Sequence, residues 1–312
     1  MTTEGGGRPT SRHLVHPSLV PALEFIPPFA TDIAGLAENR AMFAAMMELP
    51  PAPEGVERAA VAVPGLDGGP DVRGLLYRPT GAAPRVTILN LHGGGFVMGH
   101  PEMGDLRNAA LAAELGCAVL AIDYRLAPEH PWPAALNDAL AAYQWIRGQF
   151  AADTANIIIL GESAGGGLAA ALSHRLVTLG HPLPGLQALL YPMLDPRSAH
   201  DGVASPVLGE YVWTRANNSF AWSAYLGGAD PAAGPAPALA SSVEGLPPTF
   251  ILAGALDLFL DEDLDYARRL AAAGVPLELH VIAGAYHGFD MAGPSQCADQ
   301  LTSLLLRALR EV

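Results

Sequence analysis

Lysine is absent from this chain of 312 residues, and all 17 of its basic residues are arginine. The absence excludes chemistry that needs a lysine side chain: a Walker-type phosphate loop, a Schiff base with pyridoxal phosphate, and a serine–lysine catalytic pair. Positive charge is scarce altogether, because 31 acidic residues give a formal net charge of −14. Nucleic-acid phosphates and anionic membranes repel such a protein, so we expect neither nucleic acid nor a membrane as a partner.

Cysteine is nearly absent as well. Cys117 and Cys297 are too few for a disulfide framework or a cysteine-based metal site. Cys117 lies in an apolar run and is interpreted as a small core residue; a catalytic thiol there is the alternative, although buried cysteines are usually inert. Since the histidines form no spaced pairs with acidic residues, we predict no metal and no cofactor.

Long hydrophobic runs are also missing. Residues 1–8 lack the apolar segment of a secretory signal, and no apolar stretch reaches the roughly 20 residues that cross a bilayer. Half of the residues are nevertheless hydrophobic, enough for one large domain or two average ones. The sequence therefore predicts a soluble, cytoplasmic protein with a substantial core.

Apolar strand-like runs alternate with helical patterns through most of the chain. We predict a hairpin from residues 61–63 and 74–78, strands at 86–91, 118–124, 156–160, 187–191, 249–253 and 277–282, and helices at 106–115, 133–150, 166–179, 261–273 and 296–312. Unbroken apolar strands between helices indicate a mainly parallel sheet covered on both faces. The sequence is thus of the α/β class, with its catalytic domain expected at residues 56–195 and 241–312.

Residues 196–240 interrupt this alternation. They are rich in alanine, proline and glycine and carry five aromatic residues at helix-like spacing: Tyr211, Trp213, Phe220, Trp222 and Tyr225. We expect this insertion to pack with residues 1–55, which include a helical pattern at 33–49, and to form a helical cap. The alternative is an ordinary helix buried against the sheet.

The pattern Gly161-Glu162-Ser163-Ala164-Gly165 lies between a predicted strand and a predicted helix. A sharp turn in this position raises the serine hydroxyl above the sheet, and the flanking glycines let the turn close. The helix N-terminus behind the serine presents free amides to a developing oxyanion. We therefore predict Ser163 as a nucleophile; a structural or phosphate-binding glycine turn is the alternative.

Another predicted strand ends at Leu91 and is followed by His92, Gly93, Gly94 and Gly95. Three consecutive glycines are costly to order, so close approach of their amides to a substrate oxygen would explain them. These amides, with that of Ala164, are the predicted oxyanion hole. His92 itself is interpreted as a brace of the loop rather than as the base, because this kind of site takes its base from near the C-terminus.

The remaining members of a catalytic triad should follow Ser163 in the order acid, then histidine. Asp257 and His287 each come shortly after a predicted strand, at the sheet edge where α/β proteins place their sites. The imidazole could take the serine proton while the carboxylate holds its tautomer. Asp261 and Asp263 are nearby rivals of Asp257, but they begin a helix and are interpreted as first-turn acids favoured by the helix dipole.

Four motifs together resemble the hormone-sensitive-lipase family of α/β-hydrolases, in particular its small bacterial carboxylesterases. They are HGGGF at residues 92–96, DYRLAPEHP at 123–131, GESAGG at 161–166 and YHGF at 286–289. The resemblance extends from about residue 60 to residue 312. One departure is that Leu258-Phe259 follows the acid where the family often has Pro-Leu.

The resemblance implies an eight-stranded, mostly parallel sheet with a cap, and a triad of Ser163, Asp257 and His287. It also implies that Arg125 and Glu129 tie their loop beneath the site as scaffold. A homodimer through the edge strand at 277–282 is a further expectation, because members of the family often pair in this way.

We therefore predict a carboxylesterase that hydrolyses small, uncharged esters of short to medium chain length through an acyl-enzyme. Tyr191, Trp213 and Phe220 are candidate walls of the substrate pocket, with ordinary core packing as the alternative for each. A lactone or amide hydrolase using the same triad is the alternative activity. A non-catalytic ligand receptor of the same fold is a second alternative, which the intact His287 disfavours.

Overall fold

The computed structural model describes residues 11–45, 49–81, 83–150, 156–200 and 205–312. Eight strands form one sheet in the order β1-β2-β4-β3-β5-β6-β7-β8. Their bounds are β1 Val56–Val63, β2 Val72–Pro79, β3 Thr87–Leu91, β4 Ala118–Ile122, β5 Ile157–Glu162, β6 Leu186–Leu190, β7 Thr249–Gly254 and β8 Leu277–Ile282. β2 pairs antiparallel with β1 and β4, and every other pairing is parallel. The predicted eight-stranded, mostly parallel sheet is confirmed.

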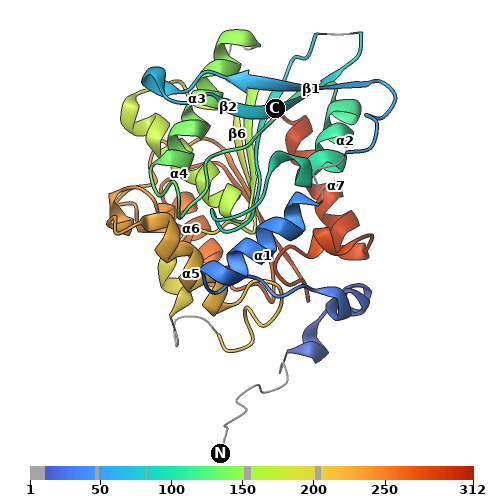
Figure 1. Cartoon of the computed structure of the whole chain (residues 1–312), viewed down its shortest axis with the longest axis vertical. Helices are drawn as coiled ribbons and strands as arrows, with labels where there is room; N and C mark the ends of the chain where they lie inside the picture. Colours follow the sequence, from blue (N-terminus) through green and yellow to red (C-terminus); the bar gives the residue numbers. More distant parts are fainter. Residues whose placement is uncertain (1–10, 46–48, 82, 151–155, 201–204) are drawn as a thin grey trace, which may run out of the picture.

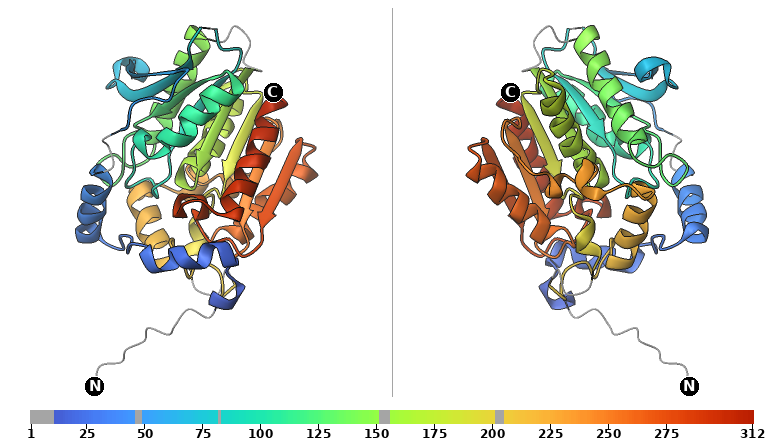
Figure 2. Two further views of the ribbon diagram at one scale, coloured as in Figure 1. Left: turned by 90° about the vertical axis from the view of Figure 1, so that its right-hand side faces the viewer. Right: turned by 90° about the vertical axis from the view of Figure 1, so that its left-hand side faces the viewer.

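Helices cover both faces of the sheet, as Figure 2 shows. The α-helices are α1 Ile33–Ala44, α2 Asp105–Leu115, α3 Ala134–Gln149, α4 Ala164–Leu179, α5 Arg215–Leu226, α6 Leu260–Ala272 and α7 Gln296–Arg310. Helices α3, α4 and α6 share one apolar core, and α2 and α7 share the other. The predicted helix over 33–49 ends at Ala44 instead, and residues 46–48 lie outside the described part of the chain.

The central strands are buried on both sides, which explains their unbroken apolar sequences. Every residue of β3, β4, β6 and β7 is buried. Side chains alternate along a strand, so Ile157 and Ile159 of β5 join the core beneath α3 and α4, while Ile158 and Leu160 join the opposite core. Two cores separated by one sheet make the strand ends a rigid platform for the side chains that follow them.

The N-terminal segment and α5 lie together at one end of the sheet (Figures 1 and 2). The side chain of Asn217 on α5 donates to the carbonyl oxygens of Phe29 and Ala30, at 2.7 and 3.1 Å. The rings of Phe29 and Trp213 also meet, with centroids 6.2 Å apart. Two segments nearly 190 residues apart in the sequence thus pack against one another at this end.

Helix α1 is fastened to the loops below it by Arg40. Its guanidinium donates to the carbonyl oxygens of Val97 and Ala127 and forms two hydrogen bonds with the carboxylate of Glu129. Arg125, in contrast, pairs with Asp138 on α3. The motif that contains Arg125 and Glu129 therefore does tie its loop in place, but Glu129 does so by holding the N-terminal segment.

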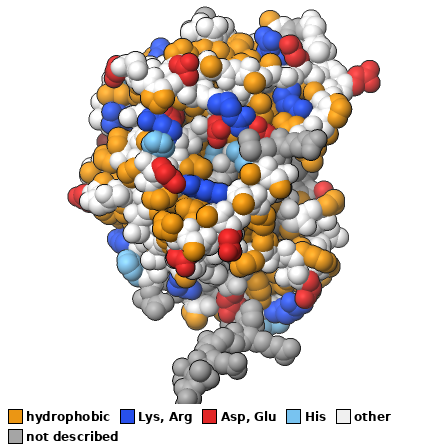
Figure 3. Space-filling model, in the orientation of Figure 1, with side chains coloured by type: hydrophobic (Ala, Val, Ile, Leu, Met, Phe, Trp, Pro, Cys, Tyr) orange, Lys and Arg blue, Asp and Glu red, His pale blue; other side chains and the backbone are white. Residues whose placement is uncertain are grey.

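Charges of both signs are scattered over the face of the molecule shown in Figure 3. On this face, arginine side chains lie among acidic and hydrophobic ones. Across the described residues, no helix combines the length and the apolar character needed to cross a membrane.

Candidate active site

The turn that carries Ser163 joins the end of β5 directly to the start of α4. Ser163 has φ of 55° and ψ of −119°, a backbone conformation that residues other than glycine rarely adopt. The turn also presses against the neighbouring strand, since a Cβ at Gly165 would lie 1.9 Å from the carbonyl oxygen of Leu91. Strain of this kind persists where surrounding structure enforces it, often at functional sites.

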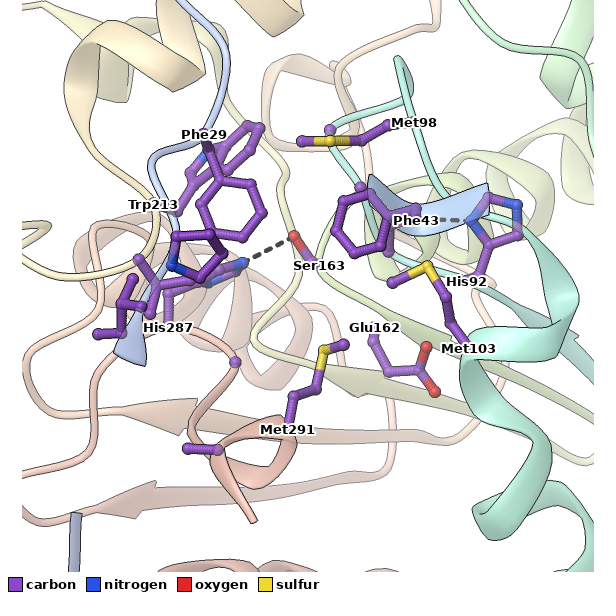
Figure 4. A pocket seen from close by; sticks show the side chains of 18 of the residues that line it. Phe29, Phe43, His92, Met98, Met103, Glu162, Ser163, Trp213, His287 and Met291 are labelled. Atoms are coloured by element: carbon purple, nitrogen blue, oxygen red, sulfur yellow. Dashed lines mark hydrogen bonds between the residues drawn. The ribbon is translucent and has the colours of Figure 1, made fainter. Parts of the chain in front are cut away.

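Ser163, His287 and Asp257 form one line of hydrogen bonds, and Figure 4 shows the bond between His287 and Ser163. The Nε2 atom of His287 lies 2.8 Å from the Ser163 hydroxyl oxygen, and Nδ1 lies 2.7 Å from a carboxylate oxygen of Asp257. The other oxygen of Asp257 accepts the backbone N–H of Phe259 at 3.0 Å. An imidazole protonated at Nδ1 donates to the carboxylate and leaves Nε2 free to accept the serine proton.

Aromatic rings surround the imidazole of His287. Phe259 and Tyr191 meet it edge-on, with centroids 5.0 and 5.1 Å away, and Trp213 lies 6.3 Å away. Phe259 belongs to the Leu258-Phe259 pair, the departure from the family pattern. It is fully buried and, like Tyr191, limits the orientations open to the imidazole.

The glycine loop lies against the turn of Ser163. A Cβ built on Gly93 would be 3.4 Å from the Cβ of Ser163. The carbonyl oxygen of Gly94 accepts the N–H groups of Val97 and Met98, which closes the loop. Gly95 has φ of 62°, and a Cβ there would lie 2.5 Å from the Trp213 ring. The structure therefore brings the predicted oxyanion glycines beside Ser163, and Ala164 follows it at the start of α4.

His92 braces this loop, in agreement with the sequence interpretation. Its Nδ1 lies 2.7 Å from the carbonyl oxygen of Gly93, and its ring stacks on Tyr124 at 4.1 Å. The Tyr124 hydroxyl donates to the carbonyl oxygen of His92. Burial lowers the pKa of His92 to about 4, so this histidine is neutral at physiological pH.

A cavity of about 420 Å³ opens above Ser163. Most of its walls are apolar, and Figure 4 shows aromatic and methionine side chains around the serine. The N-terminal segment contributes Phe29 and Phe43, the insertion contributes Trp213, and Met291 comes from the loop after His287. Tyr191 and Trp213, the candidate walls of the substrate pocket, both line this cavity.

Comparison with known proteins places this geometry in a family. Residues 88–291 match a family model described as the α/β-hydrolase fold. Esterase LipI of Mycobacterium tuberculosis is 36% identical over 261 residues, which cover 79% of this chain and 80% of that protein. The chain belongs to the hormone-sensitive-lipase-like family of α/β-hydrolases.

Solved structures of this α/β-hydrolase family resemble the whole chain. A bacterial heroin esterase superposes with a TM-score of 0.87 at 33% identity, covering 97% of this chain and 99% of that one. An esterase from the bacterial hormone-sensitive lipase family gives a TM-score of 0.79 at 28% identity, over 95% and 98% of the two chains. The likeness includes the residues outside the α/β core.

The prediction that Phe220 lines the pocket of this α/β-hydrolase is wrong. Helix α5 turns Ala221, Trp222 and Tyr225 into the core, and Phe220 packs against the same core while remaining partly exposed. It is not among the residues that line the cavity. The rotation of α5 about its axis decides which of its side chains face the cavity, and the spacing of aromatic residues in the sequence does not reveal that rotation.

The two acids interpreted as first-turn residues of α6 have different surroundings. Both lie in the first turn, as expected, and Asp261 is exposed. Asp263 is instead fully buried, and neither of its carboxylate oxygens has a hydrogen-bond partner. Burial raises the pKa of Asp263 well above its usual range, with the nearby Glu262 and Asp257 adding to the shift. A favourable interaction between an ionised side chain and the helix dipole therefore does not explain why an aspartate stands at position 263.

A charged cluster beside Ser163 was not predicted from the sequence. Arg107 on α2 forms hydrogen-bonded ion pairs with both Glu162 and Asp290, and the hydroxyl of Tyr191 donates to Asp290 at 2.6 Å. Glu162 was noted only as part of the serine motif. The one available signal for Asp290 was its place immediately after YHGF.

Other chemistry finds no support at this site. Within the described ranges, no group of three or more histidine, cysteine or acidic residues could hold a metal ion. Cys117 is buried, and burial raises its pKa to about 12, so its thiol stays protonated. A catalytic thiolate at Cys117 is therefore ruled out at neutral pH.

Proposed function

We propose that this protein is a carboxylesterase that hydrolyses short- to medium-chain uncharged esters through an acyl-enzyme on Ser163. The observation that carries the proposal is the line of hydrogen bonds from Ser163 through His287 to Asp257 at the base of an apolar cavity. The esterase names of the most similar relatives support the reaction class.

In the first half of the reaction, His287 removes the proton of Ser163 as the serine oxygen attacks the ester carbonyl carbon. Asp257 keeps the imidazole in the tautomer that has its free lone pair at Nε2, and its charge stabilises the imidazolium. The tetrahedral intermediate collapses, the bond to the alcohol oxygen breaks, and His287 gives its proton to the leaving alcohol. The acyl group then remains on Ser163.

In the second half, water takes the place of the alcohol. His287 removes a proton from the water as its oxygen attacks the acyl-enzyme, and the proton returns to Ser163 as the carboxylic acid departs. In both halves the carbonyl oxygen carries negative charge. The amides of Gly93, Gly94 and Gly95 and that of Ala164 are the donors for it, and one such donor typically contributes about 10²–10³-fold in rate.

The cavity supports the choice of substrate. Its walls are mostly apolar, and the cap side chains Phe29, Phe43 and Trp213 close over Ser163. An uncharged ester enters such a space without the desolvation cost that a charged one would meet. The limited volume favours acyl chains of short to medium length over long ones.

We also propose that residues 1–55 and 196–240 act as one cap over a catalytic domain of residues 56–195 and 241–312. The contacts between the N-terminal segment and α5 support this division. Residues 1–10, 46–48 and 201–204 of the proposed cap lie outside the described residues. A cytoplasmic location stays a prediction from the sequence.

A homodimer through β8 also stays a prediction. β8 is an edge strand with most of its residues partly exposed, so its outer hydrogen-bonding side is open to a second sheet. A monomer mass by light scattering at micromolar concentration would reject the dimer.

Labelling with a fluorophosphonate probe tests the nucleophile. We expect the folded wild-type protein and the variant Ser173→Ala to be labelled, and Ser163→Ala not to be. Ser173 is the matched control because it is a buried serine on the same helix whose hydroxyl only donates to the carbonyl oxygen of Ala169. Equal labelling of Ser163→Ala and the wild type would refute the assignment.

Rates on para-nitrophenyl esters from acetate to laurate test the substrate range. We expect kcat/KM to be greatest for short or medium acyl chains. A maximum at laurate would contradict the proposed pocket. If the para-nitroanilide with the same acyl chain is cleaved faster than the ester, the assigned activity becomes that of an amidase.

A further inference from the structure

A buried cluster of ionic side chains lies beside Ser163 and plays no part in the proton transfers described above. The guanidinium of Arg107 donates from one nitrogen to Glu162 and from the other to Asp290. Tyr191 donates its hydroxyl to the second oxygen of Asp290, and the side-chain amide of Asn90 donates to Glu162 at 3.2 Å. The side chains of Glu162 and Asp290 are only 13% and 5% exposed, so the cluster is largely shielded from water.

The cluster joins segments that are far apart in the sequence but carry the reacting groups. Glu162 is the residue immediately before Ser163. Asp290 lies three residues after His287, in the short 3-10 helix Phe289–Ala292. Arg107 lies on α2, 55 residues from Glu162 and 183 from Asp290. A single guanidinium therefore links the turn of the nucleophile to the loop of the base.

Tyr191 connects the cluster to the imidazole itself. Its hydroxyl is bonded to Asp290, while its ring meets the His287 ring edge-on at 5.1 Å. Tyr191 is almost fully buried and directly follows β6, next to the strand of the serine turn. The position of the ring against His287 thus depends on the place of Asp290.

Arg107 supplies the positive charge that compensates both carboxylates of the cluster, those of Glu162 and Asp290. Two carboxylates face each other across one guanidinium, and burial already raises the pKa of Glu162. Without the guanidinium, the two carboxylates would be buried without a cation and would repel each other or take up a proton. Repulsion would push the serine turn and the histidine loop apart, and protonation would leave them without the ion pairs that now link them.

Resting on the function proposed above, we propose that Arg107 is a positioning residue for the hydrolysis, which holds the loop of His287 and the turn of Ser163 at the separation that proton transfer needs. The distance at stake is the 2.8 Å between Nε2 of His287 and the Ser163 oxygen. A displacement of about 1 Å at such a contact can lower the rate by about 10²-fold. Arg107 itself exchanges no proton with the substrate.

The variant Arg107→Gln tests this role. We expect kcat on para-nitrophenyl butyrate to fall by about 10- to 100-fold while KM changes by less than about threefold, because the geometry of reaction is disturbed more than the cavity. Arg107→Lys restores one charged contact of the two and should recover part of kcat. The rescue separates a positioning charge from mere filling of space.

Arg73 provides the matched control. Like Arg107 it bridges two carboxylates, those of Glu102 and Asp123, but it does not line the cavity. Arg73→Gln should lower the melting temperature while keeping kcat within about twofold of the wild type. A similar loss of kcat in the Arg73 and Arg107 variants would reduce the role of Arg107 to general stability and overturn the proposal, as would an Arg107→Gln variant with kcat within about threefold of the wild type.

Two further variants serve if Arg107→Gln does not fold. Tyr191→Phe removes only the hydroxyl bound to Asp290 and should lower kcat several-fold; an unchanged kcat overturns the proposal. The double variant Asp290→Asn, Arg107→Lys should have a kcat no lower than that of the slower single variant, because both substitutions disrupt the same interaction between residues 107 and 290. If the losses in kcat of the two single variants multiply in the double variant, the shared cluster is contradicted.

Absence of Ser163 labelling in the wild type would overturn the proposed function and this inference together, whereas a labelled, fully active Arg107→Gln would overturn only the latter.

Discussion

Replacing Asp263 by asparagine should make the protein more stable, although the change removes a charge from the first turn of a helix. Asp263 is fully buried at the start of α6, and both of its oxygens lack a hydrogen-bond partner. An ionised carboxylate in such surroundings has no compensation for its lost hydration. Burial therefore raises the pKa of Asp263 well above its usual range, so the folded protein holds this proton to a higher pH than the unfolded chain does.

The sign of the pH dependence follows from the proton count. The folded state holds the Asp263 proton, whereas the unfolded chain releases it above a pKa of about 3.9. Unfolding thus releases a proton, and the free energy of unfolding falls as pH rises from about 4 toward the raised folded-state pKa. The loss amounts to about 1.4 kcal/mol for each pH unit in that window. Asparagine of the same size has no proton to release.

Urea unfolding of the wild type and Asp263→Asn at pH 5, 6 and 7 measures this difference. We expect the variant to gain about 1.4 kcal/mol over the wild type for each unit of rising pH below the raised folded-state pKa of Asp263. Asp261→Asn is the matched control: it removes an exposed acid from the same turn and should cost about 0.3–1 kcal/mol of dipole stabilisation. A difference between Asp263→Asn and the wild type that does not change with pH would refute the reasoning.

Three further predictions concern catalysis. Asp257→Asn should lower kcat on para-nitrophenyl butyrate by about 10⁴-fold with an unchanged circular dichroism spectrum, because the histidine tautomer is no longer fixed. Gly95→Ala should lower kcat/KM by about 10²-fold, since the new methyl group meets the Trp213 ring and displaces the oxyanion loop; full activity would show that the loop tolerates the shift. Phe43→Ala should move the preferred acyl chain in the nitrophenyl series to greater length, at a cost of about 3–5 kcal/mol in unfolding free energy.

The positions of the proposed catalytic residues could be predicted because each depends on local sequence. Ser163, Asp257 and His287 each follow an apolar strand, and a parallel sheet brings its strand ends to one edge whatever the details of packing. The sheet was readable for the same reason, since unbroken apolar strands between helices leave few alternatives. Boundaries were less certain: the strand predicted over 118–124 ends at Ile122.

The errors and omissions concern packing between distant segments. Spacing in the sequence showed that α5 has an aromatic side but not which way it faces, so Phe220 was assigned to the wrong surroundings. The first-turn position of Asp263 gave no sign that its side chain is buried, because burial depends on how α6 is turned against the core. The pairing of Arg107 with Asp290 spans 183 residues and depends on where α2 comes to rest. No local pattern carries that information.

The conformation of Ser163 has a consequence for selection experiments. A non-glycine residue with φ of 55° and ψ of −119° costs about 1–3 kcal/mol. Glycine adopts these angles without steric penalty, so Ser163→Gly should be at least as stable as Ser163→Ala. Its free energy of unfolding should be higher by up to about 2 kcal/mol, once the greater entropy of glycine in the unfolded chain is subtracted. A library screened only for heat resistance would therefore enrich inactive proteins at this position. Thermostable descendants of this enzyme have to be selected on turnover after heating, because the turn that carries the proposed nucleophile is also a place where the fold is held below its maximum stability.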